Sequence, residues 1–182
     1  MSRTFALSAA ALTVAAALST SACAHADPEP VPVPVPVPVP QGPSETTAPQ
    51  PDSSCAENVD GALTPADPAQ TGNNRRLLQC TAGAWQTFGG PYPSSDRWLT
   101  TGSQVILHGQ GRRNPEARAG TWTGTPQTAE AHCGAEVVDV LGAGRTSEPQ
   151  TFSADPGQSL TIEVSDHMFT TKLSGYCLWA RT

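Results

Sequence analysis

The sequence predicts an all-β protein, a small antiparallel β-sandwich or barrel with two disulfides, preceded by a signal peptide and a polyproline linker. Short runs rich in β-branched and aromatic residues alternate with Gly, Pro, Asn and Asp, which is typical of sandwiches and barrels. No long stretch shows helical periodicity. Four cysteines follow an export signal, and an even number of cysteines in an oxidising compartment indicates disulfides.

Residues 1–26 have the features of a secretory signal peptide. Arg3 precedes the apolar run "FALSAAALTVAAAL", and Ala24-His25-Ala26 forms a small-residue cleavage motif, so we expect cleavage before Asp27. The apolar run is shorter than the roughly 18–20 residues of a membrane span. Lipidation of Cys23 is the alternative, although the preceding "TSA" lacks the aliphatic residue that usually stands three positions before a lipidated cysteine.

Residues 27–54 form the predicted Pro-rich linker, disordered or in polyproline II. Val31 to Pro40 alternates valine with proline. Because proline fixes its own φ and excludes the residue before it from the α region, this segment is expected to be a polyproline II rod of roughly 30 Å. It has two interpretations: an unselected low-complexity linker, or a spacer that holds the domain away from a crowded envelope layer.

The exported chain keeps Cys55, Cys80, Cys133 and Cys177. Four cysteines allow three connectivities, and loop closure favours the local one, Cys55 with Cys80 and Cys133 with Cys177. Each bridge would stabilise the fold by roughly 3 to 4 kcal/mol in the entropy model. A four-thiolate zinc site is the alternative, but the sequence has no C-x-x-C pair.

Residues 55–182 are predicted to form a single disulfide-stapled β domain, with an N-terminal hairpin portion at 55–90 and a sandwich portion at 91–182. The hairpin is expected to pair Leu77–Thr81 with Trp85–Phe88. The remaining strands are expected at "SQVILHG", "GTWTG", "AEVVDVL", "QTFSA", "SLTIEVS", "MFTTKL" and "YCLWA".

The pattern "C…DGAL…LLQCTAGAWQ", from Cys55 to about Phe88, places two cysteines around a glycine turn and resembles small cysteine-paired modules of bacterial exported proteins. The Ala-rich signal, the A-x-A-Asp-Pro cleavage region and the preference for Arg over Lys are similar to small secreted proteins of high-GC actinobacteria of the mycobacterial type, many of them without an assigned activity. The resemblance implies export and transfers no catalytic residue.

No motif with a catalytic mechanism is present, and we predict no cofactor, metal or catalytic residue. Ser94 and Ser95 precede Asp96 but have no neighbouring histidine. The scattered histidines and carboxylates leave a secreted hydrolase as an alternative function; they are His108, His132, His167, Glu136, Asp139, Glu163 and Asp166.

The segment "GQGRRNPEARAG" gathers Arg112, Arg113 and Arg118 in a chain of net charge −6. The acidic balance argues against nucleic acid as a partner. The arginine segment is expected to be an exposed loop, which either pairs with Glu116 and the acidic surface or binds an anion, since guanidinium groups grip phosphate and carboxylate.

Trp98, in the loop-like "SSDRWLT", is the tryptophan expected to be exposed, and the other three are expected in the core. These observations predict a secreted or cell-envelope-associated, non-enzymatic binding module with no transmembrane segment after signal removal. Its partner would be an anionic cell-envelope component or another protein. A structural envelope protein is the further alternative.

Overall fold

The computed structural model describes residues 47–67, 75–109 and 113–182. The predicted signal peptide, Cys23, the Val-Pro segment and Arg112 lie outside the described residues. Within those three ranges, no helix has the length and apolar character needed to cross a membrane.

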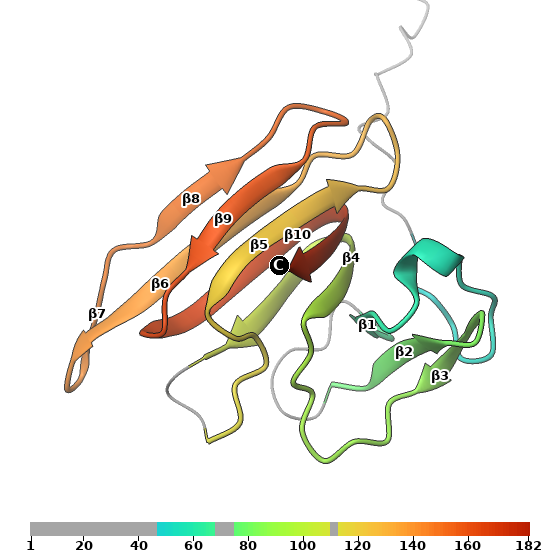
Figure 1. The fold of residues 1–182 in the computed structure, drawn as a ribbon, viewed down its shortest axis with the longest axis horizontal. Coiled ribbons are helices and arrows are strands. Elements are labelled where there is room, and N and C mark those ends of the chain that lie inside the picture. Colours follow the sequence, from blue (N-terminus) through green and yellow to red (C-terminus); the bar gives the residue numbers. More distant parts are fainter. Residues whose placement is uncertain (1–46, 68–74, 110–112) are drawn as a thin grey trace, which may run out of the picture. The chain divides into compact units, whose positions relative to one another are not determined.

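The described chain consists of ten strands and one short 3-10 helix, which confirms the all-β prediction (Figure 1). In chain order the elements are η1 (Glu57–Val59), β1 (Leu63–Pro65), β2 (Leu77–Thr81), β3 (Ala84–Thr87), β4 (Arg97–His108), β5 (Gly120–Pro126), β6 (Gly134–Gly142), β7 (Arg145–Thr146), β8 (Gln150–Ser153), β9 (Leu160–Val164) and β10 (Met168–Arg181).

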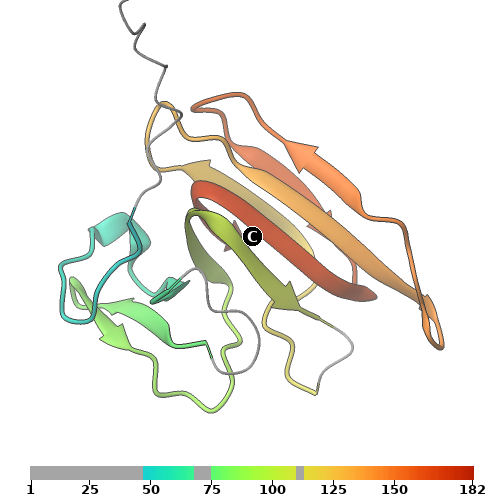
Figure 2. The same ribbon diagram turned by 180° about the vertical axis from the view of Figure 1, so that it is seen from behind.

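Strand β10 is the centre of the sheet. It pairs with β4 over nearly its whole length, while its other edge is shared: β6 pairs with Met168–Ser174, and β5 pairs with Cys177–Arg181. Strand β9 continues from β5, and β8 continues from β6. The sheet therefore branches at β10, and Figures 1 and 2 show β5 and β9 on one side of the fold with β4, β10 and β6 on the other.

The main core lies between these two layers. Its largest side chains are the fully buried rings of Trp98, Trp122 and Trp179. On β9 the inward Ile162 and Val164 are buried, whereas the residues between them face solvent, as the two-residue period of a strand with one wet face requires.

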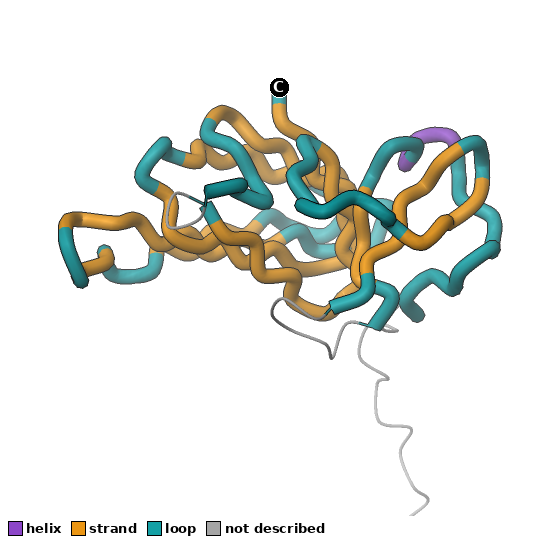
Figure 3. The backbone as a smooth tube through the Cα atoms, turned by 90° about the horizontal axis from the view of Figure 1, so that it is seen from below, coloured by secondary structure: helices purple, strands orange, loops and turns teal. Residues whose placement is uncertain are grey.

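A second, smaller core joins the N-terminal hairpin to the sheet. Leu78 and Trp85 pack against Leu99 of β4 and Leu178 of β10. Strands β4 and β10 are therefore buried on both faces at this end. Figure 3 shows η1 beside this hairpin. Strand β1 pairs with β4 in parallel, through Leu63 and Trp98, so the sheet is mixed, where a purely antiparallel one was expected.

The two expected disulfides are present. Cys55 bonds to Cys80 within the N-terminal portion, and Cys133 bonds to Cys177 across the branch of the sheet. The zinc alternative for these four cysteines is thereby excluded.

The domain begins earlier than the expected boundary at residue 55. Ala48 is buried, the Asp52 amide donates to the Trp85 carbonyl (2.7 Å), and Ser54 forms a β-bridge with Ala84. Residues 47–54 thus cover the outer edge of β3 and belong to the fold, not to the linker.

One strand is longer than expected. The stretches "MFTTKL" and "YCLWA" form one strand, β10, because Ser174-Gly175 is a bulge in it and not a turn. Gly175 has φ +86°, and a Cβ placed there would overlap the His132 carbonyl oxygen. The backbone of His132, just before the disulfide-bonded Cys133, therefore packs directly against Gly175. No other residue can replace this glycine without movement of the backbone.

We expect Gly175→Ala to destabilise the protein by about 3 kcal/mol or more, because it adds a backbone overlap to the strain of a positive φ. The matched control is Gly144→Ala, which shares the positive φ (+71°) but has open space around the added methyl group, and it should cost about 1 kcal/mol. Urea unfolding of both variants gives the comparison. Equal losses would show that Gly175 matters only for its φ.

Candidate functional site

A pocket of about 520 Å³ lies between the β2–β3 hairpin, the loop that follows β3 and the segment that begins at Arg113. Its volume is in the range of small-molecule sites. Its lining combines cationic, aromatic and neutral polar side chains; among them are Arg75, Arg76, Arg113, Phe88, Tyr92, Thr87, Asn114 and Glu116.

Glu116 and Arg75 form a buried ion pair in the pocket wall. Arg75 Nη2 donates to Glu116 Oε1 (2.6 Å), and the two side chains are only 6% and 9% exposed. Arg75 also donates to the Ile106 carbonyl (2.7 Å), and its guanidinium lies over the Trp98 ring. Breaking a buried pair leaves an uncompensated charge, which costs several kcal/mol, so this pair fixes the wall of the pocket.

His108 completes the coordination of Glu116. Its backbone amide and its ring Nδ1–H both donate to Glu116 Oε2, each at 2.9 Å; an ionised carboxylate selects this tautomer. Three acceptor positions of the carboxylate are thus occupied. Within the described residues the His108 ring bonds to Glu116 alone, so this histidine helps to hold the carboxylate in place.

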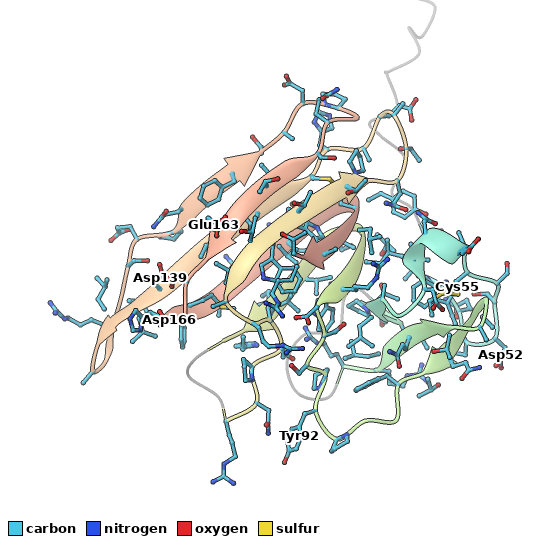
Figure 4. The ribbon with its side chains drawn as sticks, in the orientation of Figure 1. Asp52, Cys55, Tyr92, Asp139, Glu163 and Asp166 are labelled. Atoms are coloured by element: carbon cyan, nitrogen blue, oxygen red, sulfur yellow. A yellow bond between two sulfur atoms is a disulfide. The ribbon has the colours of Figure 1, made fainter. Side chains whose placement is uncertain are left out.

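The rim of the pocket carries exposed groups. Arg113 is exposed and makes no ion pair with any described residue, and Tyr92 is 58% exposed. Figure 4 shows Tyr92 on the loop between β3 and β4. The charge of Arg75 is balanced by Glu116, whereas the exposed Arg113 places a positive charge at the rim of the pocket, in a chain of net charge −6.

The three arginines of the predicted loop do not form one cluster. Arg113 lines the pocket, Arg112 lies outside the described residues, and Arg118 turns to a different cluster, where its Nη2 donates to Asp96 Oδ2 (2.9 Å). Glu116 was expected to pair with this loop, but its partner is Arg75. The pair "RR" at 75–76 and the sequence "GGPYP" were not singled out from the sequence, yet they supply much of the pocket.

The expectation that Trp98 is exposed is wrong: its side chain is fully buried. Trp98 belongs to the first half of β4, opposite Trp179 of β10, and Arg75 lies over its ring. Glycine and threonine in "LTTG" weakened the strand signal at this point, while pairing with β10 keeps the segment extended.

The carboxylates considered for a hydrolase do not line the pocket. Figure 4 places Asp139, Glu163 and Asp166 on the part of the sheet formed by β6 and β9, away from Tyr92. Asp139 accepts from Ser165 and Glu163 from Thr121, each at 2.7 Å. No cluster of three or more His, Cys, Asp or Glu positioned to hold a metal occurs in the part of the chain that the structure describes.

No protein-family model, curated protein or solved structure matches the chain. A functional assignment therefore rests on the residues of the site.

Asp96 fastens the last strand to the rest of the fold. Arg181 donates to both Asp96 oxygens, at 2.7 and 3.2 Å, and Arg118 donates to one of them. The hydrogen bonds from Arg181 lower the pKa of the Asp96 carboxyl below its ordinary value of 3.8; they outweigh the effect of its partial burial, and the charge of Arg118 adds to them.

We expect Asp96→Asn to lower the free energy of unfolding at pH 7 by about 1 kcal/mol. A carboxyl whose folded pKa is depressed stabilises the fold above its unfolded pKa, and this contribution is lost as the pH falls through the folded pKa. The difference between variant and wild type should therefore shrink below pH 3.8.

Urea unfolding at pH 7 and at low pH measures this difference. Glu130→Gln is the control, because that exposed side chain makes no ion pair or hydrogen bond with a described residue, and its stability should match the wild type. A difference for Asp96→Asn that persists undiminished at low pH would show that the carboxylate charge is not responsible.

Proposed function

We propose that this protein is a non-enzymatic, extracytoplasmic binding module that holds an anionic component of the cell envelope in the pocket lined by Arg113 and Tyr92. The observation that carries the proposal is the guanidinium of Arg113 at the rim of the pocket, which is exposed and makes no ion pair with any described residue, in a chain that is acidic overall. A local positive charge in an acidic protein attracts anions to that point of the surface. Guanidinium groups bind carboxylate and phosphate through paired hydrogen bonds.

The two disulfides support the extracytoplasmic part of the proposal, because such bonds persist in oxidising compartments. The export signal at residues 1–26 agrees with this location. The Val-Pro segment is then a spacer, which lets the domain reach a ligand embedded in a crowded layer.

The engaged state of Glu116 favours binding over catalysis. A general base must accept the proton that it removes, whereas three of the about four acceptor positions of the Glu116 carboxylate already accept hydrogen bonds from Arg75 and His108. The wall of the pocket is therefore held by the Arg75–Glu116 pair, and its rim is open to a ligand. This arrangement suits the binding of a ligand.

We expect Arg113→Ala to weaken binding to cell-envelope fractions about tenfold or more at low salt, since a charge-assisted hydrogen bond is worth about 1.5 kcal/mol or more. Binding by the wild type should fall as salt rises, and the variant should show a smaller salt effect. Co-sedimentation of the purified protein with envelope fractions measures both quantities.

The matched control is Arg118→Ala. Arg118 belongs to the same sequence segment, but its guanidinium is bound to Asp96 outside the pocket, so this variant should bind as the wild type does. Equal binding by all three proteins, or an equal loss in both variants, would contradict the proposed site.

A further inference from the structure

We infer that the unpaired edge of β9 binds a second copy of this protein, with the two β9 strands antiparallel around a two-fold axis at Ile162. The inference is independent of the proposed function, since β9 and the pocket lining share no residue. It follows from the backbone groups that β9 presents, from the side chains beside them and from the unprotected state of this edge.

Strand β9 has one paired edge and one unpaired edge. It pairs with β5, with Trp122 opposite Ile162, and lies beside it as the last strand on its branch of the sheet (Figure 1). No other segment that the structure describes forms a β-ladder with β9. Strand β8 lies on the other branch, where it pairs with β6.

The hydrogen bonds of β5 determine which groups of β9 are unpaired. The Thr121 carbonyl accepts from the Thr182 amide (3.0 Å), so the backbone of Thr121 faces β10 and not β9. Its partner on β9, Glu163, is therefore in a pair without backbone hydrogen bonds. Because the two kinds of pair alternate in an antiparallel ladder, Thr161 is in the same state. The amides and carbonyls of Thr161 and Glu163 thus point to the unpaired edge.

These groups complement themselves under a two-fold axis. With Ile162 opposite Ile162 of the second copy, Thr161 of each copy lies opposite Glu163 of the other. Each of these pairs can exchange both of its N–H···O bonds, as hydrogen-bonded pairs of an antiparallel ladder do. The register that places Glu163 opposite Glu163 would set like charges directly against each other, which is destabilising.

The exposed side chains of β9 already form cross-strand contacts of this kind with β5. Thr121 Oγ1 donates to Glu163 Oε1 (2.7 Å), and Thr123 Oγ1 lies 3.2 Å from Thr161 Oγ1. A carboxylate has about four acceptor positions, so Glu163 can accept from Thr161 of the second copy as well. The proposed register therefore repeats, on the unpaired edge, the threonine–glutamate contact of the paired edge.

Strand β9 lacks a proline, a bulge and an inward-pointing charge, the features that protect an edge strand. Its five residues are Leu160–Val164, its ladder with β5 is regular, and the inward Ile162 and Val164 are apolar and buried. Other edges are protected: residues 52–55 cover the edge of β3, and Pro149, which has no N–H, directly precedes β8. The edge of β9 is therefore the one suited to a second copy.

The first test is amide hydrogen exchange of the purified protein at low and high concentration. We expect the amides of Thr161 and Glu163 to exchange rapidly at about 10 µM and to become about tenfold protected or more at about 1 mM, because the dimer pairs them. The amide of Ile162 should be protected at both concentrations, since it faces β5.

Exchange of Thr161 and Glu163 that does not depend on concentration would overturn the inference. Slow exchange throughout would show that another segment of the same chain covers the edge. Rapid exchange throughout would show that the edge stays unpaired.

The second test uses charge at Thr161. Thr161→Glu places a carboxylate opposite Glu163 of the second copy and should raise the dissociation constant of the dimer about fivefold or more, whereas Thr161→Lys places an ammonium there and should lower it about threefold or more. Sedimentation equilibrium measures both constants.

The matched controls are Thr151→Glu and Thr151→Lys. Thr151 is also an exposed threonine of a strand with a single partner, but it lies on β8, so both variants should dimerise as the wild type does. Changes of the same sign in the two Thr161 variants, or equal changes in the Thr151 variants, would contradict the register. A wild-type protein that is still monomeric at about 1 mM would contradict the inference as a whole.

Discussion

The fold depends on one constraint, the bulge at Gly175 where β10 changes partners. Before the bulge β10 pairs with β6, and after it β10 pairs with β5. The Cys133–Cys177 bridge closes the same point, joining the residue before β6 to the first residue of the β5 pairing. The long strand β10 can therefore pair with β6 in one half and with β5 in the other. This arrangement requires glycine at the bulge, because a side chain at position 175 would overlap the backbone of His132.

This branch also determines where the pocket lies. Because β4 follows β10 along its whole length, the first half of β4 extends past the two-layered core and receives the N-terminal hairpin on its other face. Arg75 enters from that hairpin and Glu116 from the loop after β4, and their ion pair lies over Trp98. The pocket wall therefore joins the two portions of the domain, and its rigidity derives from both cores.

Sequence patterns predicted the features that depend on residues close together in the chain. Alternating hydrophobicity predicted β9, loop closure predicted the disulfide pairs, and the turn expected at Ala82-Gly83-Ala84 predicted the β2–β3 hairpin, in which Ala84 proves to be the first residue of β3. The patterns failed where the local structure depends on pairing with a strand far away in the sequence. Gly175 has the sequence context of a turn, but pairing of β10 with β4 keeps it within the strand as part of a bulge. Trp98 has the sequence context of a loop, but it pairs with Trp179 of β10 and is buried. The pocket was missed because Arg75, Tyr92 and Arg113 are far apart in sequence and meet only in the fold.

Amide hydrogen exchange of the protein bound to a soluble extract of the cell envelope tests most directly whether this pocket is the binding surface. The account predicts that protection on binding is confined to residues 75–77, 87–93 and 113–116, the segments that line the pocket, since a ligand held there shields the amides around it. Protection centred on the β6–β7 hairpin near the exposed Leu141, or the absence of any protected segment, would contradict it.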